Sequence, residues 1–131
     1  MVACTLLDIE GRIVLLKRAI DPQKGKWVLP GGYVDRGEPV PDAAIRETRE
    51  ECGIVVEIKA LLGIYSYPGR TQAVVVYVGK RLSGDLIPAD ETLEARLFGK
   101  YNIPWNKLAF KSTTQALKDY FSMKERCREN P

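Results

Sequence analysis

The chain contains no histidine. This absence excludes Ser-His-Asp and Cys-His catalysis, phosphohistidine chemistry and zinc sites built on imidazole. Any acid–base chemistry must therefore come from carboxylates, lysine, tyrosine or a metal-bound water.

Cysteine is scarce, and long apolar runs are absent. Cys4, Cys52 and Cys127 are scattered and form no C-x-x-C pair, which excludes a zinc ribbon and a disulfide framework. Reduced thiols are typical of cytoplasmic proteins, so we expect a cytoplasmic location. No apolar run approaches 18 residues and no signal peptide is evident, so we expect no membrane span.

Size and charge set broad limits. A chain of 131 residues is expected to form one domain, residues 1–131, with its own core. The net charge is +3, with Lys and Arg spread along the chain. This balance suits a phosphate-bearing small molecule and gives no reason to expect nucleic acid as a partner.

Apolar runs and turn signals predict an α/β protein. Glu10-Gly11 is a hairpin signal between the first two expected strands. A helix is expected over 42–52, with Pro39 and Pro41 near its first turn and Gly53 at its end. Strands are expected at 2–9, 12–17, 27–29, 55–67, 72–82 and 94–98. Ser112 to Gln115 resembles a capping box, which predicts a last helix from Ser112 to about Lys124, followed by a frayed tail over 124–131.

Three carboxylates are the most informative feature of the expected helix. Glu47, Glu50 and Glu51 have the spacing i, i+3, i+4, so they share one helix face. Crowded carboxylates repel each other, and a hard cation such as Mg²⁺ or Mn²⁺ would remove that repulsion. The alternative is a solvated acidic face paired with Arg46 and Arg49.

Residues 32–54, GYVDRGEPVPDAAIRETREECGI, match G-x5-E-x7-R-E-U-x-E-E-x-G-U, where U is usually aliphatic. Thr48 departs from the pattern, because it occupies a U position and is not aliphatic. With this segment the chain resembles the Nudix hydrolases, which cleave nucleoside diphosphates linked to another group. The likeness extends to GKWVLPGGYVDRGE over 25–38 and to Glu91–Phe98, where Leu97 stands in place of a usual Trp.

The resemblance implies an α/β/α sandwich with a mixed β-sheet between helices. It also implies that Glu47, Glu50, Glu51 and the carbonyl of Gly32 bind Mg²⁺, with Mn²⁺ as a substitute. Glu38, Arg46 and Gly53 are expected to be structural parts of the signature, with Arg46 pairing with Glu38 or with a ligand carboxylate. Glu91 is the first candidate for the general base, with Glu94 second and Glu50 acting through water as a third; the alternative is that Glu91 and Glu94 are plain surface acids.

The resemblance is greatest to the ADP-ribose pyrophosphatase-like branch. It implies water attack on the diphosphate of ADP-ribose or a related compound. The alternatives are a nucleoside triphosphate pyrophosphohydrolase that cleanses the nucleotide pool, or a catalytically silent nucleotide-binding domain. Many relatives are dimers, so a homodimer is possible. Candidate substrate contacts are Arg18, Arg70 and Tyr67, with Tyr65 and Trp105 as further aromatic candidates for stacking on a base.

Overall fold

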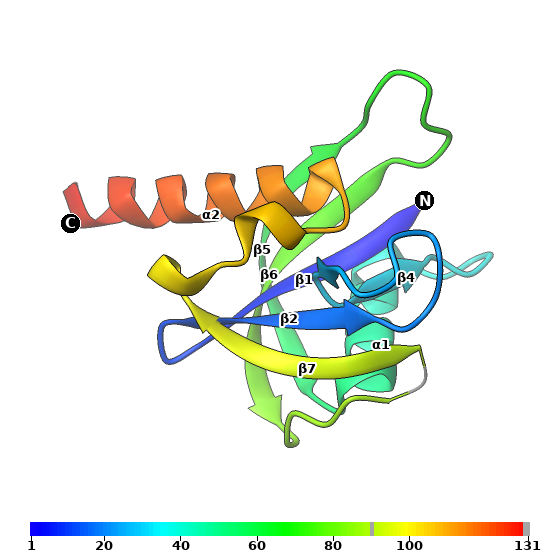
Figure 1. Cartoon of the computed structure of the whole chain (residues 1–131), viewed down its shortest axis with the longest axis horizontal. Helices are drawn as coiled ribbons and strands as arrows, with labels where there is room; N and C mark the ends of the chain where they lie inside the picture. The colour runs from blue at the N-terminus through cyan, green and yellow to red at the C-terminus, as the bar shows by residue number, and fades with distance from the viewer. Residues whose placement is uncertain (90, 130–131) are drawn as a thin grey trace.

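The computed structural model describes residues 1–89 and 91–129 (Figure 1). Its strands are β1 (Val2–Ile9), β2 (Arg12–Arg18), β3 (Trp27–Val28), β4 (Gly31–Tyr33), β5 (Val55–Tyr65), β6 (Val74–Ser83) and β7 (Thr92–Gly99). Its α-helices are α1 (Val40–Cys52) and α2 (Lys111–Glu129). Two short 3₁₀ helices, Lys100–Asn102 and Trp105–Lys107, connect β7 to α2.

The strands form one mixed sheet. Its main order is β3-β2-β1-β6-β5, while β4 pairs with β1 and β7 pairs with β2. The pairing of β1 with β6 is parallel, and the other strand pairs are antiparallel. The β1–β2 connection is the predicted hairpin, because Glu10 and Gly11 have φ values of 53° and 85° and the Gly11 amide donates to Asp8 at 2.8 Å.

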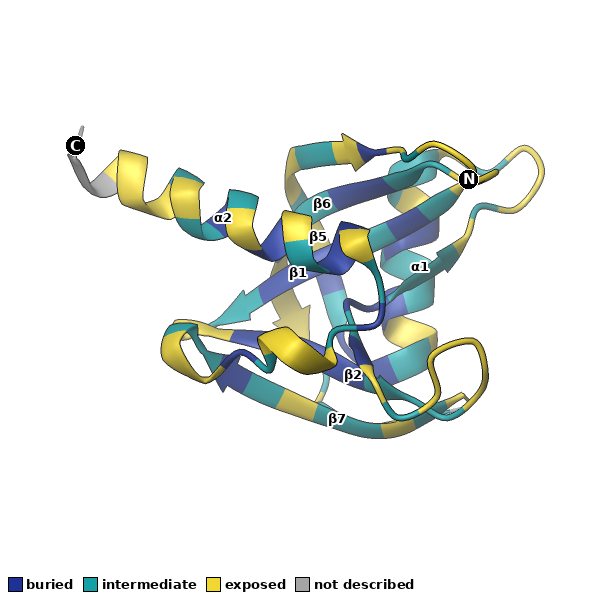
Figure 2. Ribbon diagram, turned by 45° about the horizontal axis from the view of Figure 1, so that its top comes forward, coloured by how far each residue is buried: buried dark blue, intermediate teal, exposed yellow. Residues whose placement is uncertain are grey.

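The two helices cover opposite faces of the sheet. Alternation along β1 places Leu6 in the apolar cluster beneath α2, with Leu117 and Tyr120, and Leu7 in the cluster that contains Cys52 at the end of α1. Figure 2 shows buried residues along the central strands β1, β2 and β6. The expected mixed sheet between helices is confirmed.

Helix α1 forms where the sequence predicts it, with an earlier start. It begins at Val40 after Pro39, so Pro41 lies in the first turn, where a missing N–H costs little. It ends at Gly53, whose φ of 78° is the left-handed conformation that favours glycine and whose amide donates to the Arg49 carbonyl at 2.9 Å.

The strand predictions need correction in two places. Strand β4 was not expected, because Gly31-Gly32 has low strand propensity; it forms because the glycines pack tightly against β1. The strands expected over 55–67 and 72–82 are β5 and β6, which leave 66–73 as a longer loop that projects from the body in Figure 1.

The end of the chain also differs from expectation. Helix α2 begins at Lys111, so the expected capping box at Ser112 is wrong. The helix continues through Glu129 rather than fraying after Lys124, because no breaker precedes residue 130 and the last turns carry basic residues that suit a helix C-terminus. Residues 130 and 131 of the expected tail lie outside the described residues.

Candidate active site

A cleft of about 730 Å³ opens between the β4–α1 corner and the start of α2. One wall carries Gly31, Gly32, Glu47, Glu50 and Glu51. The rest is lined by residues of β2 and the loop after it, by the 66–73 loop, by Glu91 and by Phe110 to Thr113. The cleft therefore joins segments from nearly the whole length of the chain.

The glycine corner brings backbone directly against the acidic helix. A Cβ on Gly32 would lie 2.4 Å from the Glu47 carboxyl carbon, and a Cβ on Gly31 would lie 2.5 Å from the Cys4 sulfur. Side chains at these two positions would displace the carboxylate or the strand. Glycine is required here for close approach, because both positions lie where a Cβ would fill the space.

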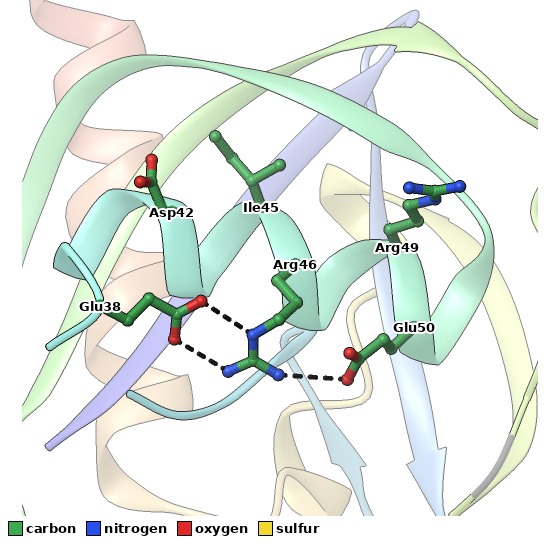
Figure 3. Close-up of a pocket in the computed structure, with 6 residues that line it drawn as sticks. All are labelled: Glu38, Asp42, Ile45, Arg46, Arg49 and Glu50. Carbon is green, nitrogen blue, oxygen red and sulfur yellow. Dashed lines mark hydrogen bonds and ion pairs between the residues drawn. The ribbon is translucent and has the colours of Figure 1, made fainter. Parts of the chain in front are cut away.

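Arg46 organises the signature segment. Its Nε and Nη2 donate to both Glu38 oxygens, at 2.9 and 3.0 Å, and its Nη1 donates to Glu47 at 2.9 Å and Glu50 at 3.2 Å. Nη2 also donates to the Tyr33 carbonyl at 3.0 Å, which ties β4 to α1. Figure 3 shows Arg46 between Glu38 and Glu50 on the outer side of α1.

This network shifts the pKa values of Glu38 and Arg46. Hydrogen bonds from Arg46 and from the Asp35 amide lower the pKa of Glu38, and the bond to Glu38 raises that of Arg46. Both of the pairings expected for Arg46 therefore occur together, since it contacts Glu38 and also Glu47 and Glu50.

The surroundings of Glu51 in the cleft disfavour its charged form. Burial raises its pKa to about 8, and the adjacent Glu47 carboxylate adds to the rise, while the Gly31 backbone and Arg18 oppose it. Burial together with Glu51 and Glu47 also raises the pKa of Cys4 to about 12, so this cleft thiol stays protonated and is a poor ligand for a soft metal.

The chemistry of this wall fits a hard cation. Its donors are carboxylate and carbonyl oxygens, and a cation would offset the burial and the Glu47 charge that raise the pKa of Glu51. Within 1–89 and 91–129, however, no three acidic, cysteine or histidine groups stand ready to enclose an ion. In this structure Arg46 holds one oxygen each of Glu47 and Glu50.

The remaining predicted residues divide into two groups. Arg18, Arg70, Tyr67 and Glu91 all line the cleft. Glu94 instead pairs with Arg96 at 2.7 Å and is not among the cleft residues.

Neither further aromatic candidate lines the cleft. Tyr65 is buried and donates to Asp119 at 2.7 Å, and Trp105 packs edge-on against Phe121. Tyr65 is therefore a packing residue, whereas Trp105 is 42% exposed outside the cleft.

The sequence reading missed the α2 side of the cleft, formed by Phe110, Lys111, Ser112 and Thr113. It assigned Ser112 to helix capping. No local pattern marks these four residues as cleft residues, because only the packing of α2 across the sheet brings them opposite the acidic wall.

A model of the NUDIX domain family matches residues 1–117. The chain therefore belongs to the Nudix family and is a Nudix hydrolase. It is 37% identical over 123 residues to an ADP-ribose pyrophosphatase of Methanocaldococcus jannaschii, covering 91% of this chain and 71% of that protein.

Two further comparisons bear on fold and chemistry. A crystal structure of a Nudix hydrolase from Nitrosomonas europaea superposes with a TM-score of 0.90 at 38% identity, covering 95% of this chain and 71% of that one. A putative 8-oxo-dGTP diphosphatase of Bacillus subtilis is 36% identical over 92 residues, or 70% of this chain and 59% of that protein. Within the described residues, neither helix is long and apolar enough to cross a membrane.

Proposed function

We propose that the protein hydrolyses the diphosphate of ADP-ribose or a related nucleoside diphosphate derivative, using Mg²⁺ or Mn²⁺. The observation that carries this proposal is the half-buried Glu47–Glu51 pair facing a glycine corner within a cleft large enough for a nucleotide. The 37% identity to an ADP-ribose pyrophosphatase over 91% of the chain supports the choice of substrate.

Glu47, Glu50, Glu51 and the Gly32 carbonyl would hold the cation. A bound divalent cation supplies charge neutralisation at the diphosphate oxygens and lowers the pKa of a bound water. To hold the cation, Glu47 and Glu50 would release Arg46, which would keep its two bonds to Glu38 and so maintain the loop against α1.

Proton transfer falls to carboxylates, because the chain has no histidine. Glu91 is the proposed general base: it lines the cleft, and its backbone carbonyl accepts from the Ala19 amide at 3.0 Å, which fixes its segment beside β2. Glu50 is the second candidate, because half of its side chain is exposed at the cleft wall and can contact a water. Glu94 is not a proposed base, because it pairs with Arg96 and does not line the cleft.

A second function has one observation in its favour. The similarity to a putative 8-oxo-dGTP diphosphatase supports a nucleoside triphosphate pyrophosphohydrolase with the same acidic wall. The two functions differ in what the rest of the cleft accepts, so the substrate distinguishes them.

A substrate panel tests the proposal. Purified protein is incubated with ADP-ribose, NADH, dinucleoside polyphosphates, nucleotide sugars and nucleoside triphosphates, with Mg²⁺ and with excess chelator. We expect ADP-ribose or a close relative to be cleaved fastest, and only with the cation. Preferred cleavage of triphosphates would favour the second function, and full turnover in chelator would contradict both.

A further inference from the structure

Helix α2 starts without a cap, and its first turn faces the cleft. Its first internal bond runs from the Thr114 amide to the Phe110 carbonyl, at 3.3 Å. Among the residues described, no acceptor takes the amides of Lys111, Ser112 or Thr113, and Phe110 has no side-chain oxygen to serve as a cap. The positive end of a 19-residue helix is thus directed at the cleft.

Two hydroxyl groups at this turn are independent evidence for a ligand. Ser112 and Thr113 are only 8% and 5% exposed, and both line the cleft. In the part of the chain that the structure covers, neither hydroxyl has a hydrogen-bond partner. Among the same residues, every side-chain polar atom that is fully buried does have a partner, so these two hydroxyl oxygens are not fully buried. The hydroxyls therefore reach the cleft itself, where a ligand can bond to them.

Arg18 adds a fixed cation beside this turn. Its Nε donates to the Pro22 carbonyl at 2.7 Å, and its guanidinium lies 5.3 Å from the centre of the Phe110 ring. These contacts fix the side chain and leave both Nη groups without a carboxylate at ion-pair distance within residues 1–89 and 91–129. Arg18 is half-buried and lines the cleft between the acidic wall and α2.

From this arrangement we infer that Arg18 and the first turn of α2, through Ser112, Thr113 and their amides, bind a phosphate group of the substrate, opposite the acidic wall. The inference rests on the proposed function, because it assigns the second phosphate of the diphosphate to this subsite. Amides, hydroxyls and a guanidinium can all donate, and a phosphate offers only acceptors at neutral pH.

The donor set argues against a base edge as the occupant. An adenine edge presents a donor as well as acceptors, whereas the charged members of this subsite, Arg18 and the nearby Lys111, are donors only. A fixed guanidinium and a helix N-terminus both favour negative charge.

Calorimetric titration with inorganic pyrophosphate tests the inference, in chelator and again with Mg²⁺. Arg18→Gln should weaken pyrophosphate binding about tenfold or more. The double variant Ser112→Ala/Thr113→Val, which keeps helix and packing, should weaken it about fivefold. Arg12→Gln is the matched control, because Arg12 is an exposed residue at the opposite end of β2, and it should change binding by less than about twofold. Adenosine, titrated in parallel, should bind equally to all four proteins.

These binding measurements decide the inference without any measurement of catalytic turnover. Unchanged pyrophosphate binding in the Ser112→Ala/Thr113→Val variant and in Arg18→Gln would overturn the inference, as would failure of the unmodified protein to bind pyrophosphate in either buffer. If the variants lose adenosine binding but keep pyrophosphate binding, the subsite binds the base, and the inference is overturned. If the variants weaken pyrophosphate binding as expected but the protein leaves ADP-ribose intact, the proposed function fails while the phosphate subsite stands.

Discussion

Thr48 shows how a single residue is accommodated where the family usually has an aliphatic side chain. It is fully buried, its hydroxyl donates to the Ala44 carbonyl at 2.7 Å, and it lies 3.0 Å from the hydroxyl of Thr5 on β1. Thr5 is also within 3.4 Å of the Ala44 carbonyl. The two threonines thus satisfy each other at the α1–β1 contact, which explains why a polar residue is tolerated there.

This pairing predicts a coupled effect on stability. Thr48→Val keeps the shape of the side chain but removes a partner of Thr5, and it should lower the free energy of unfolding by about 1–2 kcal/mol. Thr5→Val/Thr48→Val should recover part of that loss, because no hydroxyl is then left without its partner. Urea unfolding of the unmodified protein, Thr48→Val, Thr5→Val and the double variant measures the coupling; additive losses would show that the two hydroxyls act independently.

The acidic residues give a prediction for activity. Glu50→Gln keeps the size of the side chain and removes a proposed ligand charge, so kcat should fall about 10²-fold or more while the protein stays folded. Glu94→Gln is the matched control, because Glu94 pairs with Arg96 and does not line the cleft. Steady-state kinetics with circular dichroism measure both; near-normal kcat in Glu50→Gln would remove Glu50 from the ligand set.

At the scale of elements, the position of α2 decides the shape of the cleft. Two phenols fix it: Tyr120 donates to Asp8 on β1 at 2.6 Å, and Tyr65 on β5 donates to Asp119 at 2.7 Å. Burial, with the hydrogen-bonded aspartate as a further cause, raises the pKa of both tyrosines. These bonds hold the first turn of α2 opposite α1.

The raised tyrosine pKa values predict alkaline sensitivity. A tyrosine whose folded-state pKa lies above its unfolded value contributes stability below about pH 10, and that contribution is lost as the pH rises through the folded-state pKa. Tyr65→Phe/Tyr120→Phe should be less stable than the unmodified protein at pH 8, by about 1–3 kcal/mol, and should lose less stability between pH 8 and pH 11. Urea unfolding at both pH values tests this; equal losses in the two proteins would contradict it.

Most elements could be predicted from sequence, and the failures have identifiable causes. Apolar runs located the longer strands, and the turn at Glu10-Gly11 and the end of α1 at Gly53 follow from local conformation. Strand β4 depends on the close approach of Gly31 to Cys4, which no propensity encodes. The start of α2 was misplaced because the Ser112 hydroxyl lies at the cleft rather than over the helix end.

In the site, too, residues set by local sequence could be predicted, and residues set by packing could not. The acidic wall comes from one continuous segment with helical spacing, so its members could be predicted from the sequence. Phe110, Ser112 and Thr113 face that wall only because α2 packs across the sheet, a relation between residues some sixty positions apart in the chain. Arg18 was a candidate from sequence, but its fixed orientation follows from Pro22 and Phe110.

At the scale of the whole molecule, the cleft has an acidic wall, the proposed cation site, on one side and a donor-rich wall on the other. In the proposed function, a diphosphate placed between them would be neutralised from both sides, and its hydrolysis would need no covalent protein nucleophile. The absence of histidine agrees with this direct route.

Product analysis in ¹⁸O-labelled water tests this account most directly. With ADP-ribose and Mg²⁺, we predict AMP and ribose 5-phosphate, with solvent oxygen in only one of the two products and no cleavage in excess chelator. Pyrophosphate release from nucleoside triphosphates, with ADP-ribose left untouched, would contradict the account.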